Sequence, residues 1–171
     1  MWTTMWSNIA KHFEGHPERL AVARLLVETG LSTRDGKIYC NQIEIPTKRV
    51  AQAAGVDRRT VTKTIQTISS NPQLKEIFTR MRSAGLSLRE IARHLEFGVL
   101  EITPQDPHSV GILAKASTLI SEHNISIRQA IVDDPELSPE PKLTLIAETK
   151  LPGELIPKLL KVPGIAKVSI Y

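Results

Sequence analysis

The sequence predicts an α+β protein in which an N-terminal all-α domain precedes a domain of mixed strands and helices. Three observations support this prediction. Two short helical segments meet at Gly55, the apolar pattern becomes strand-like after Phe97-Gly98, and the charge balance changes sign near the same point. Residues 1–98 carry 15 Lys and Arg against 9 Asp and Glu, a net charge of +6, whereas residues 99–171 carry 7 against 9, a net charge of −2. We therefore expect two domains with different partners.

The N-terminal half shows the signals of a series of helices. We expect helices over 5–14 and from Pro17 to a cap at Gly30, then a turn-rich stretch at 31–46 with short extended pieces after Asp35-Gly36. Another helix begins at Asn71-Pro72 and ends at Gly85. Residues 1–85 form the predicted N-terminal domain. Ser87-Leu88-Arg89-Glu90 is a capping box, so residues 86–98 are predicted to be a connecting helix.

Residues 50–65 have the layout of a helix-turn-helix, whose second helix enters the DNA major groove. Gly55 permits a close turn, Asp57 can cap the second helix, and apolar residues at Val50, Val56, Val61 and Ile65 hold the helices together. Thr47 can cap the first helix. Arginine side chains near the start of the second helix can bind guanine edges, and Lys48 and Thr60 suit phosphates. The candidate DNA-binding residues are Thr47, Lys48, Arg58, Arg59, Thr60, Thr62 and Lys63.

Ala54-Gly55-Val56, followed by Thr60-Val61, resembles the helix-turn-helix signature of bacterial and archaeal regulators, particularly the lactose-repressor-like proteins. Thr64 stands where that family usually has an aliphatic residue, and Ile65 can take over its packing role. The resemblance implies DNA binding. The alternative is a plain helical hairpin with a solvated basic face.

Residues 99–171 predict the order strand-helix-strand-strand-helix-strand of a ferredoxin-like βαββαβ domain. The predicted strands contain Val99 to Ile102, Ile125 to Ile131, Leu143 to Ala147 and Val168 to Ile170. Helices are expected over Val110 to His123 and Pro152 to Leu160. Residues 133–141 form an acidic, proline-bearing loop.

The segment Asp106-Pro107-His108-Ser109-Val110-Gly111, followed after a helix by Asn124-Ile125-Ser126, makes this domain similar to an ACT domain. That resemblance implies an amino-acid effector, bound where the first strand meets the first helix and commonly between two such domains. Backbone N–H groups at a helix N-terminus favour binding of the ligand's carboxylate, and Asp106 can form an ion pair with its ammonium group. The loop is two residues longer than in that family, and Val110 replaces its proline. A domain that only dimerises is the alternative. The candidate ligand-binding residues are Asp106, His108, Val110, Gly111, Ile112, Asn124, Ile125 and Ser126.

The whole chain resembles archaeal regulators of amino-acid metabolism that contain an ACT domain. This resemblance implies an allosteric transcriptional regulator that forms homodimers, or higher homo-oligomers, through the ACT domain. The alternative is an adaptor that does not bind DNA and docks on an amino-acid biosynthetic enzyme. With one cysteine and no nucleophile, phosphate-loop or zinc signature, we expect no enzymatic activity, no cofactor and no metal. The absence of a long apolar run predicts a cytoplasmic protein without a membrane partner.

Overall fold

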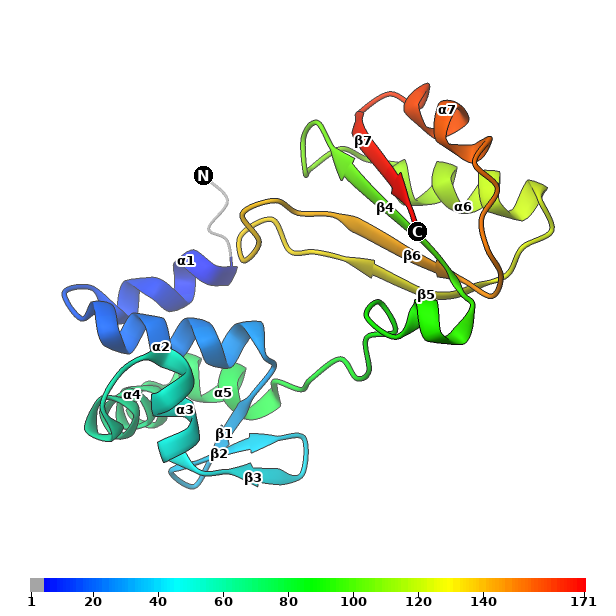
Figure 1. The fold of residues 1–171 in the computed structure, drawn as a ribbon. Helices are drawn as coiled ribbons and strands as arrows, with labels where there is room; N and C mark the ends of the chain where they lie inside the picture. The colour runs from blue at the N-terminus through cyan, green and yellow to red at the C-terminus, as the bar shows by residue number, and fades with distance from the viewer. Residues whose placement is uncertain (1–4) are drawn as a thin grey trace. The chain divides into compact units, whose positions relative to one another are not determined.

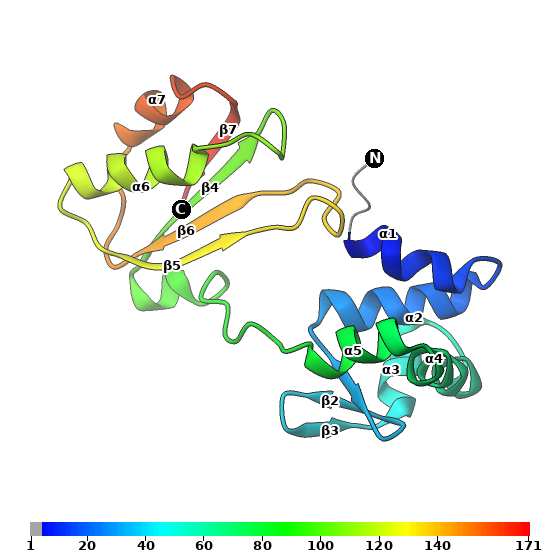
Figure 2. The same cartoon turned by 180° about the vertical axis from the view of Figure 1, so that it is seen from behind.

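The computed structural model describes residues 5–171 of the 171-residue chain. The chain folds into two compact units, and the boundary between them in the sequence falls between Gly85 and Leu86 (Figures 1 and 2). None of the helices among the described residues has the length and apolar character that a membrane span requires.

In the N-terminal unit, helices precede and follow a small antiparallel sheet along the chain. Its elements are α1 (Met5–Ala10), η1 (Lys11–Phe13), α2 (Pro17–Glu28), β1 (Ser32–Arg34), β2 (Lys37–Cys40), β3 (Ile43–Ile45), α3 (Thr47–Ala54), α4 (Arg58–Ser70) and α5 (Pro72–Arg80). Helices α2, α3 and α4 all pack against one another. Their core is aliphatic apart from two phenylalanines, and its fully buried members include Phe13, Val22, Leu26, Ile38, Val61, Ile68, Leu74 and Phe78.

The prediction of an all-α N-terminal domain is wrong, because strands β1, β2 and β3 form a three-stranded sheet. The expected extended pieces are confirmed within it. Asp35 and Gly36 both have positive φ, 50° and 73°, as a tight two-residue hairpin turn requires. Ile38 is fully buried, and Ser32 and Thr33 of the neighbouring strand β1 are buried as well.

Gly30 ends the α2 segment in the left-handed conformation, with φ of 64°, as predicted. It also lies against the chain that leaves the unit, because a Cβ at Gly30 would be 2.7 Å from the Ser83 Cα. The chain is attached to the C-terminal unit from Leu86 onward by hydrogen bonds. There the Gln129 side chain donates to the Leu86 carbonyl at 2.6 Å and accepts the Leu88 N–H at 2.8 Å. Only Ala84 and Gly85 lie between these two anchored points.

The C-terminal unit has the predicted ferredoxin-like order, with strand order β5-β6-β4-β7 and antiparallel neighbours. Its elements are η2 (Ala92–Leu95), β4 (Gly98–Pro104), α6 (Ile112–Glu122), β5 (Ile127–Val132), β6 (Leu143–Ala147), α7 (Leu155–Leu160) and β7 (Ile165–Ile170). Figure 1 shows α6 and α7 on one face of this sheet.

The two faces of the sheet bury different residues. Leu100, Ile102 and Leu145 pack with α6 and α7 in the main core. Val99 and Ile146 point to the other face, where they pack with Ala92 in a second, smaller cluster. The alternation of side chains along a strand explains why neighbours such as Val99 and Leu100 belong to different clusters.

The predicted helix over residues 86–98 is replaced by irregular chain, a turn and the four-residue 3₁₀ helix η2. The capping box does not form, since the Ser87 Oγ accepts the Arg89 N–H rather than the Glu90 N–H, and the Leu88 N–H donates to Gln129. Leu88, Ala92 and Phe97 pack against Val99 and Ile146, so burial on the sheet face overrides the local helix signal.

Candidate DNA-binding surface and effector loop

Helices α3 and α4 are joined by the tight turn that the sequence predicts. Gly55 has φ of 66°, and the Val56 N–H donates to the Ala51 carbonyl at 3.0 Å. Asp57 caps α4, because its Oδ1 accepts the Thr60 N–H at 2.8 Å. This hydrogen bond holds the pKa of the Asp57 carboxyl below its usual value. The turn and the cap together fix where α4 begins.

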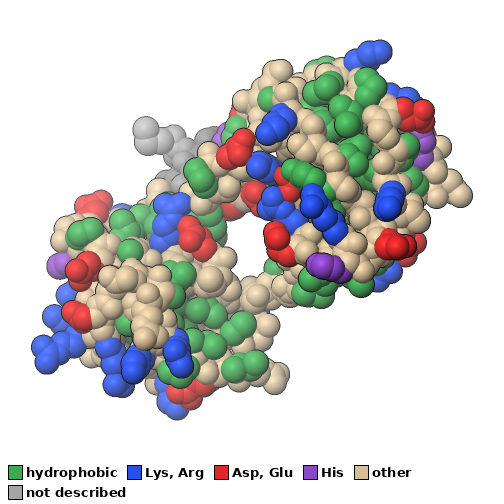
Figure 3. Space-filling view, in the orientation of Figure 1, with side chains coloured by type: hydrophobic (Ala, Val, Ile, Leu, Met, Phe, Trp, Pro, Cys, Tyr) green, Lys and Arg blue, Asp and Glu red, His purple; other side chains and the backbone are tan. Residues whose placement is uncertain are grey.

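The burial pattern of α4 defines its outer face. Thr60, Val61, Thr64, Ile65 and Ile68 are buried, whereas Arg58, Arg59, Thr62, Lys63 and Gln66 are exposed. Thr64 is completely buried, and its hydroxyl donates to the Thr60 carbonyl at 2.9 Å. Ile65 therefore packs beside Thr64 rather than in its place. The exposed set puts basic side chains near the helix N-terminus, and Figure 3 shows Lys and Arg gathered over the region of α3 and α4.

Thr47 does not cap α3, so that prediction is wrong. Pro46 holds the capping position without a side-chain hydrogen bond, and Thr47 is the first helical residue. Its hydroxyl instead accepts a hydrogen bond from the Arg58 Nε at 3.2 Å. This contact joins the first residue of α3 to the first residue of α4, and it orients the arginine that leads the exposed face.

An open groove of about 450 Å³ runs beside this contact, between the β2–β3 hairpin and the two helices. Of the predicted DNA-binding residues, the structure brings Thr47, Lys48, Arg58 and Thr62 together there. The hairpin side of the groove, which contains Lys37 and Glu44, is not predicted from the sequence pattern. The Lys37 Nζ lies 2.8 Å from the Glu44 Oε2, and this hydrogen bond and charge raise the pKa of Lys37. The one feature of the sequence that points to this side of the groove is the basic residue Lys37 directly after the Asp35-Gly36 turn.

The remaining predicted DNA-binding residues divide into two kinds. Arg59 and Lys63 are exposed, and neither takes part in an ion pair within residues 5–171. Thr60 is buried, and its hydroxyl donates to the Glu18 carboxylate of α2 at 3.1 Å. Thr60 therefore joins two helices and does not share the exposed face.

In the C-terminal unit, the loop between β4 and α6 is closed by its own aspartate. Asp106 accepts the His108 N–H through Oδ1 at 2.9 Å, and its carbonyl accepts the Ser109 N–H at 2.9 Å. Val110 is 94% exposed, and Gly111 precedes α6 with φ of 83°. Ile112 is buried in the main core. The loop thus leaves the first turn of α6 without a side-chain cap.

Asn124, Ile125 and Ser126 lie beyond the far end of α6, so one copy of the chain does not bring them to Gly111. The 11 residues of α6 correspond to about 16 Å of helix. A smaller cavity of about 140 Å³ does adjoin Gly111 and Ile112. It is lined largely by apolar and proline side chains, together with Ser109, Asp133 and Lys142, which the sequence analysis did not select. The described residues contain no cluster of three or more potential metal ligands.

The chain thus joins a helix-turn-helix with an exposed basic face to a ferredoxin-like α+β unit. No protein-family model and no curated protein matches it. Among solved structures, it is similar to an AsnC family transcriptional regulator from Agrobacterium tumefaciens, with 14% identity, 90% of this chain and 86% of the other covered, and a TM-score of 0.29.

Two further solved structures show likenesses of the same order. A transcriptional regulatory protein of the AsnC family from Pyrococcus furiosus has 13% identity, with 91% and 86% of the two chains covered and a TM-score of 0.24. Another transcriptional regulator has 16% identity, with 91% and 90% covered and a TM-score of 0.29. These neighbours are transcriptional regulators. Likenesses at these TM-scores carry no weight for the present chain, whose function is argued below from its own geometry.

Proposed function

We propose that this protein is a transcriptional regulator that binds DNA through α4 and responds to an amino acid bound by its C-terminal unit. The observation that carries the proposal is the exposed face of α4. Arg58, Arg59, Thr62 and Lys63 share its N-terminal half, while the opposite face is buried. This is the part of a recognition helix whose side chains reach base edges in the major groove.

The surrounding basic residues suit the phosphate backbone. Lys48 and Arg49 are exposed in the first turn of α3, and Lys37 lies across the groove on β2. Contacts of this kind position a protein on DNA without reading sequence, and they make its affinity depend steeply on salt. Arg58 and Arg59 are then the residues for sequence readout, since a two-pronged arginine contact with guanine is worth about 1–3 kcal/mol of discrimination.

The effector would bind at the β4–α6 loop, near Gly111, at an interface between two ACT-like units. The uncapped first turn of α6 offers backbone N–H groups to a carboxylate. The distance from Gly111 to Asn124–Ser126 within one copy fits a site that a second copy completes. A homodimer of this kind would present two α4 helices to half-sites about 34 Å apart. A coupling of about 1–3 kcal/mol would change DNA affinity by about 5–150-fold.

The test is DNA selection from a random-sequence pool with the wild type, followed by affinity measurements over a salt series. We expect a steep salt dependence, and we expect the double variant Arg58→Ala, Arg59→Ala to lose sequence preference. The matched control is Lys75→Ala, Arg80→Ala, which removes two exposed charges from α5 in the same unit. If the wild type binds no DNA at low salt, the proposal fails and the adaptor that docks on a biosynthetic enzyme becomes the better explanation.

A further inference from the structure

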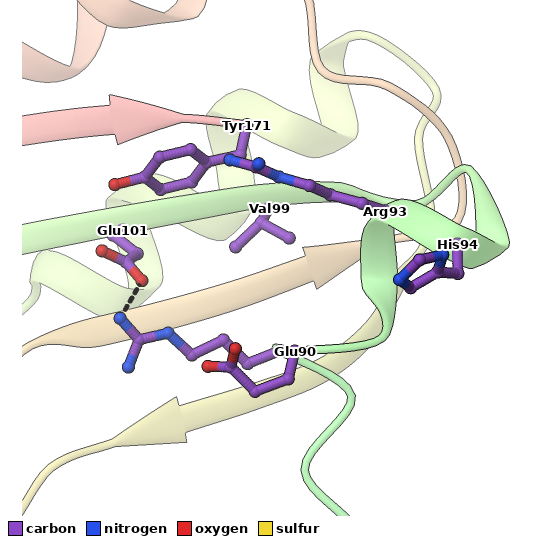
Figure 4. A pocket seen from close by; sticks show the side chains of 7 residues that line it. Glu90, Arg93, His94, Val99, Glu101 and Tyr171 are labelled. Carbon is purple, nitrogen blue, oxygen red and sulfur yellow. Dashed lines mark ion pairs between the residues drawn. The ribbon is translucent and has the colours of Figure 1, made fainter.

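A second pocket lies on the sheet face of the C-terminal unit that α6 and α7 do not cover. It has a volume of about 430 Å³, which is in the range of small-molecule sites. Figure 4 shows its lining side chains, which come from the 89–94 segment, from β4 and from the residue after β7. We call it the open-face pocket, and its lining residues are Arg89, Glu90, Arg93, His94, Val99, Glu101 and Tyr171.

The open-face pocket is separate from the Gly111 loop. Val99 lies five residues, or about 17 Å, before Pro104, where the loop begins, and Glu101 lies three residues before it. Backbone hydrogen bonds between Val99 and Tyr171, at 3.2 and 2.9 Å, hold the aromatic wall to β4. Val99, Glu101 and Tyr171 therefore attach the pocket to the sheet, while its other walls come from the 89–94 segment, and none of its lining residues belongs to the loop to which the ACT resemblance points.

One pair of charges in the pocket is already satisfied. Glu101 is only 8% exposed, and its carboxylate forms an ion pair with the Arg89 guanidinium. A buried carboxylate needs such a partner, because an unpaired one would be costly to desolvate. Arg89 and Glu101 thus form a neutral floor at one side of the pocket, next to the apolar side chain of Val99.

A second pair of charges is not satisfied by the protein. Arg93 extends over the Tyr171 ring, with its Cζ 5.1 Å from the ring centroid, and Glu90 lies on the opposite wall (Figure 4). Within residues 5–171, neither Arg93 nor Glu90 forms an ion pair. The two side chains are three positions apart in sequence, yet they point to different walls. Among the described residues, the pocket therefore offers one guanidinium and one carboxylate without ion-pair partners, on different walls around Val99 and the Arg89–Glu101 pair.

We propose that the open-face pocket binds a small zwitterion of the α-amino-acid class. Arg93 receives the ligand carboxylate, for which a guanidinium is the best matched partner. Glu90 receives the ammonium group, and the ligand side chain lies over Val99 and Tyr171. The equal numbers of Arg and Glu lining the pocket favour a ligand without net charge over a phosphate or a dicarboxylate. This inference concerns a second site, and it does not depend on DNA binding.

The experiment is isothermal titration of the full-length protein with each of the twenty L-α-amino acids. Any amino acid that binds is then tested as its N-acetyl and carboxamide derivatives, each of which lacks one of the two charges. We expect binding of at least one amino acid, and we expect both derivatives to bind at least about tenfold more weakly, as the loss of a charge-assisted hydrogen bond requires.

Variants locate the site. Arg93→Gln and Glu90→Gln should each weaken binding at least about tenfold, whereas Glu122→Gln and Lys115→Gln, exposed residues of α6, should leave it unchanged. Arg93→Lys keeps the charge but loses the two-pronged contact, so it reports on the site if Arg93→Gln fails to fold. Two binding events are expected if the effector also binds at the Gly111 loop, and the event that Arg93→Gln removes is the one assigned to the open-face pocket. The inference is overturned if Arg93→Gln removes no binding event, if the N-acetyl form retains that event at full strength, or if no amino acid of the panel binds. The DNA-binding result for Arg58→Ala, Arg59→Ala tests only the proposed function. The proposed function can be wrong and the open-face pocket can still bind an amino acid.

Discussion

At the scale of single residues, Arg58 is the most constrained of the proposed DNA contacts, because Thr47 accepts a hydrogen bond from its Nε. Thr47→Val keeps the shape of the side chain and removes this acceptor. We expect specific DNA affinity to fall by about 0.5–1.5 kcal/mol, the usual worth of one hydrogen bond, with less effect on non-specific affinity. Fluorescence anisotropy with specific and scrambled duplexes measures both. Thr149→Val, an exposed threonine of the other unit, is the control, and equal losses on both duplexes would contradict this role.

Thr64 is a polar residue in the buried face of α4, and its hydroxyl bonds only within its own helix. Thr64→Val replaces that hydroxyl with a methyl group of similar volume. We expect the free energy of unfolding to change by no more than about 1 kcal/mol, because no partner in another element is left unpaired. Urea denaturation measures the change. A loss of several kcal/mol would mean that the helix depends on this hydroxyl in a way that the hydrogen bonds do not indicate.

Asp57 makes part of the stability of α4 depend on pH. Its pKa is lowered in the folded state by the Thr60 N–H, so its contribution is complete above the unfolded pKa of about 3.9 and is lost as the pH falls through the lower folded value. Asp57→Asn retains a capping oxygen that does not titrate. We expect the melting temperature of the wild type to fall more steeply than that of Asp57→Asn below about pH 4. Parallel acid profiles would contradict this.

At the scale of elements, Gly30 is required for two separate reasons. Its φ is positive, and a Cβ would overlap the backbone at Ser83. Gly15 has a similar φ of 75° with open space around it, so it offers a matched comparison. We expect Gly15→Ala to cost about 1–2 kcal/mol from backbone conformation alone, and Gly30→Ala to cost at least about 1 kcal/mol more. Chemical denaturation of both variants tests this, and equal costs would show that the chain at Ser83 moves aside freely.

The elements that the sequence predicts well are those in which local signals and burial agree. The turn at Gly55, the cap at Asp57 and the ferredoxin-like order all follow from residues that act on their immediate neighbours. The 86–98 segment could not be predicted in this way, because the Gln129 side chain that takes the Leu88 N–H lies 41 positions further on. The open-face pocket was missed for the same reason, since its walls come from three separate parts of the chain.

The small sheet of the N-terminal unit illustrates a milder failure. Asp35-Gly36 and the isoleucines around it do indicate extended chain, but three strands of three or four residues give too short a pattern to establish a sheet. Among the candidate site residues, the exposure of Arg58, Arg59, Thr62 and Lys63 follows from the helical period. The burial of Thr60 follows from the same period, since Thr64 and Ile68 lie one and two turns later, but its hydrogen bond to Glu18 in another helix does not.

At the scale of the whole molecule, we expect the proposed regulation to pass through the connector, the two residues Ala84 and Gly85 that join the anchored ends of the units. Insertion of a Gly-Ser-Gly-Ser segment between these two residues should leave the affinity for a single half-site and the effector affinity, each measured alone, within about twofold of the wild type. The change in DNA affinity on adding effector should shrink, because a longer flexible linker transmits less of it. DNA titrations with and without the effector measure this coupling. An unchanged coupling would show that the signal does not travel along the connector.

The brevity of this connector also has a consequence for the search for an operator. Two residues of extended chain reach no more than about 7 Å. In the proposed dimer, once one α4 helix has engaged its half-site, the other is held nearby at an effective concentration that short linkers commonly place in the millimolar range. The second binding event then becomes intramolecular. Two half-site contacts that are each weak can together keep the dimer bound to DNA, whereas the dimer would dissociate quickly from a single half-site elsewhere in the genome.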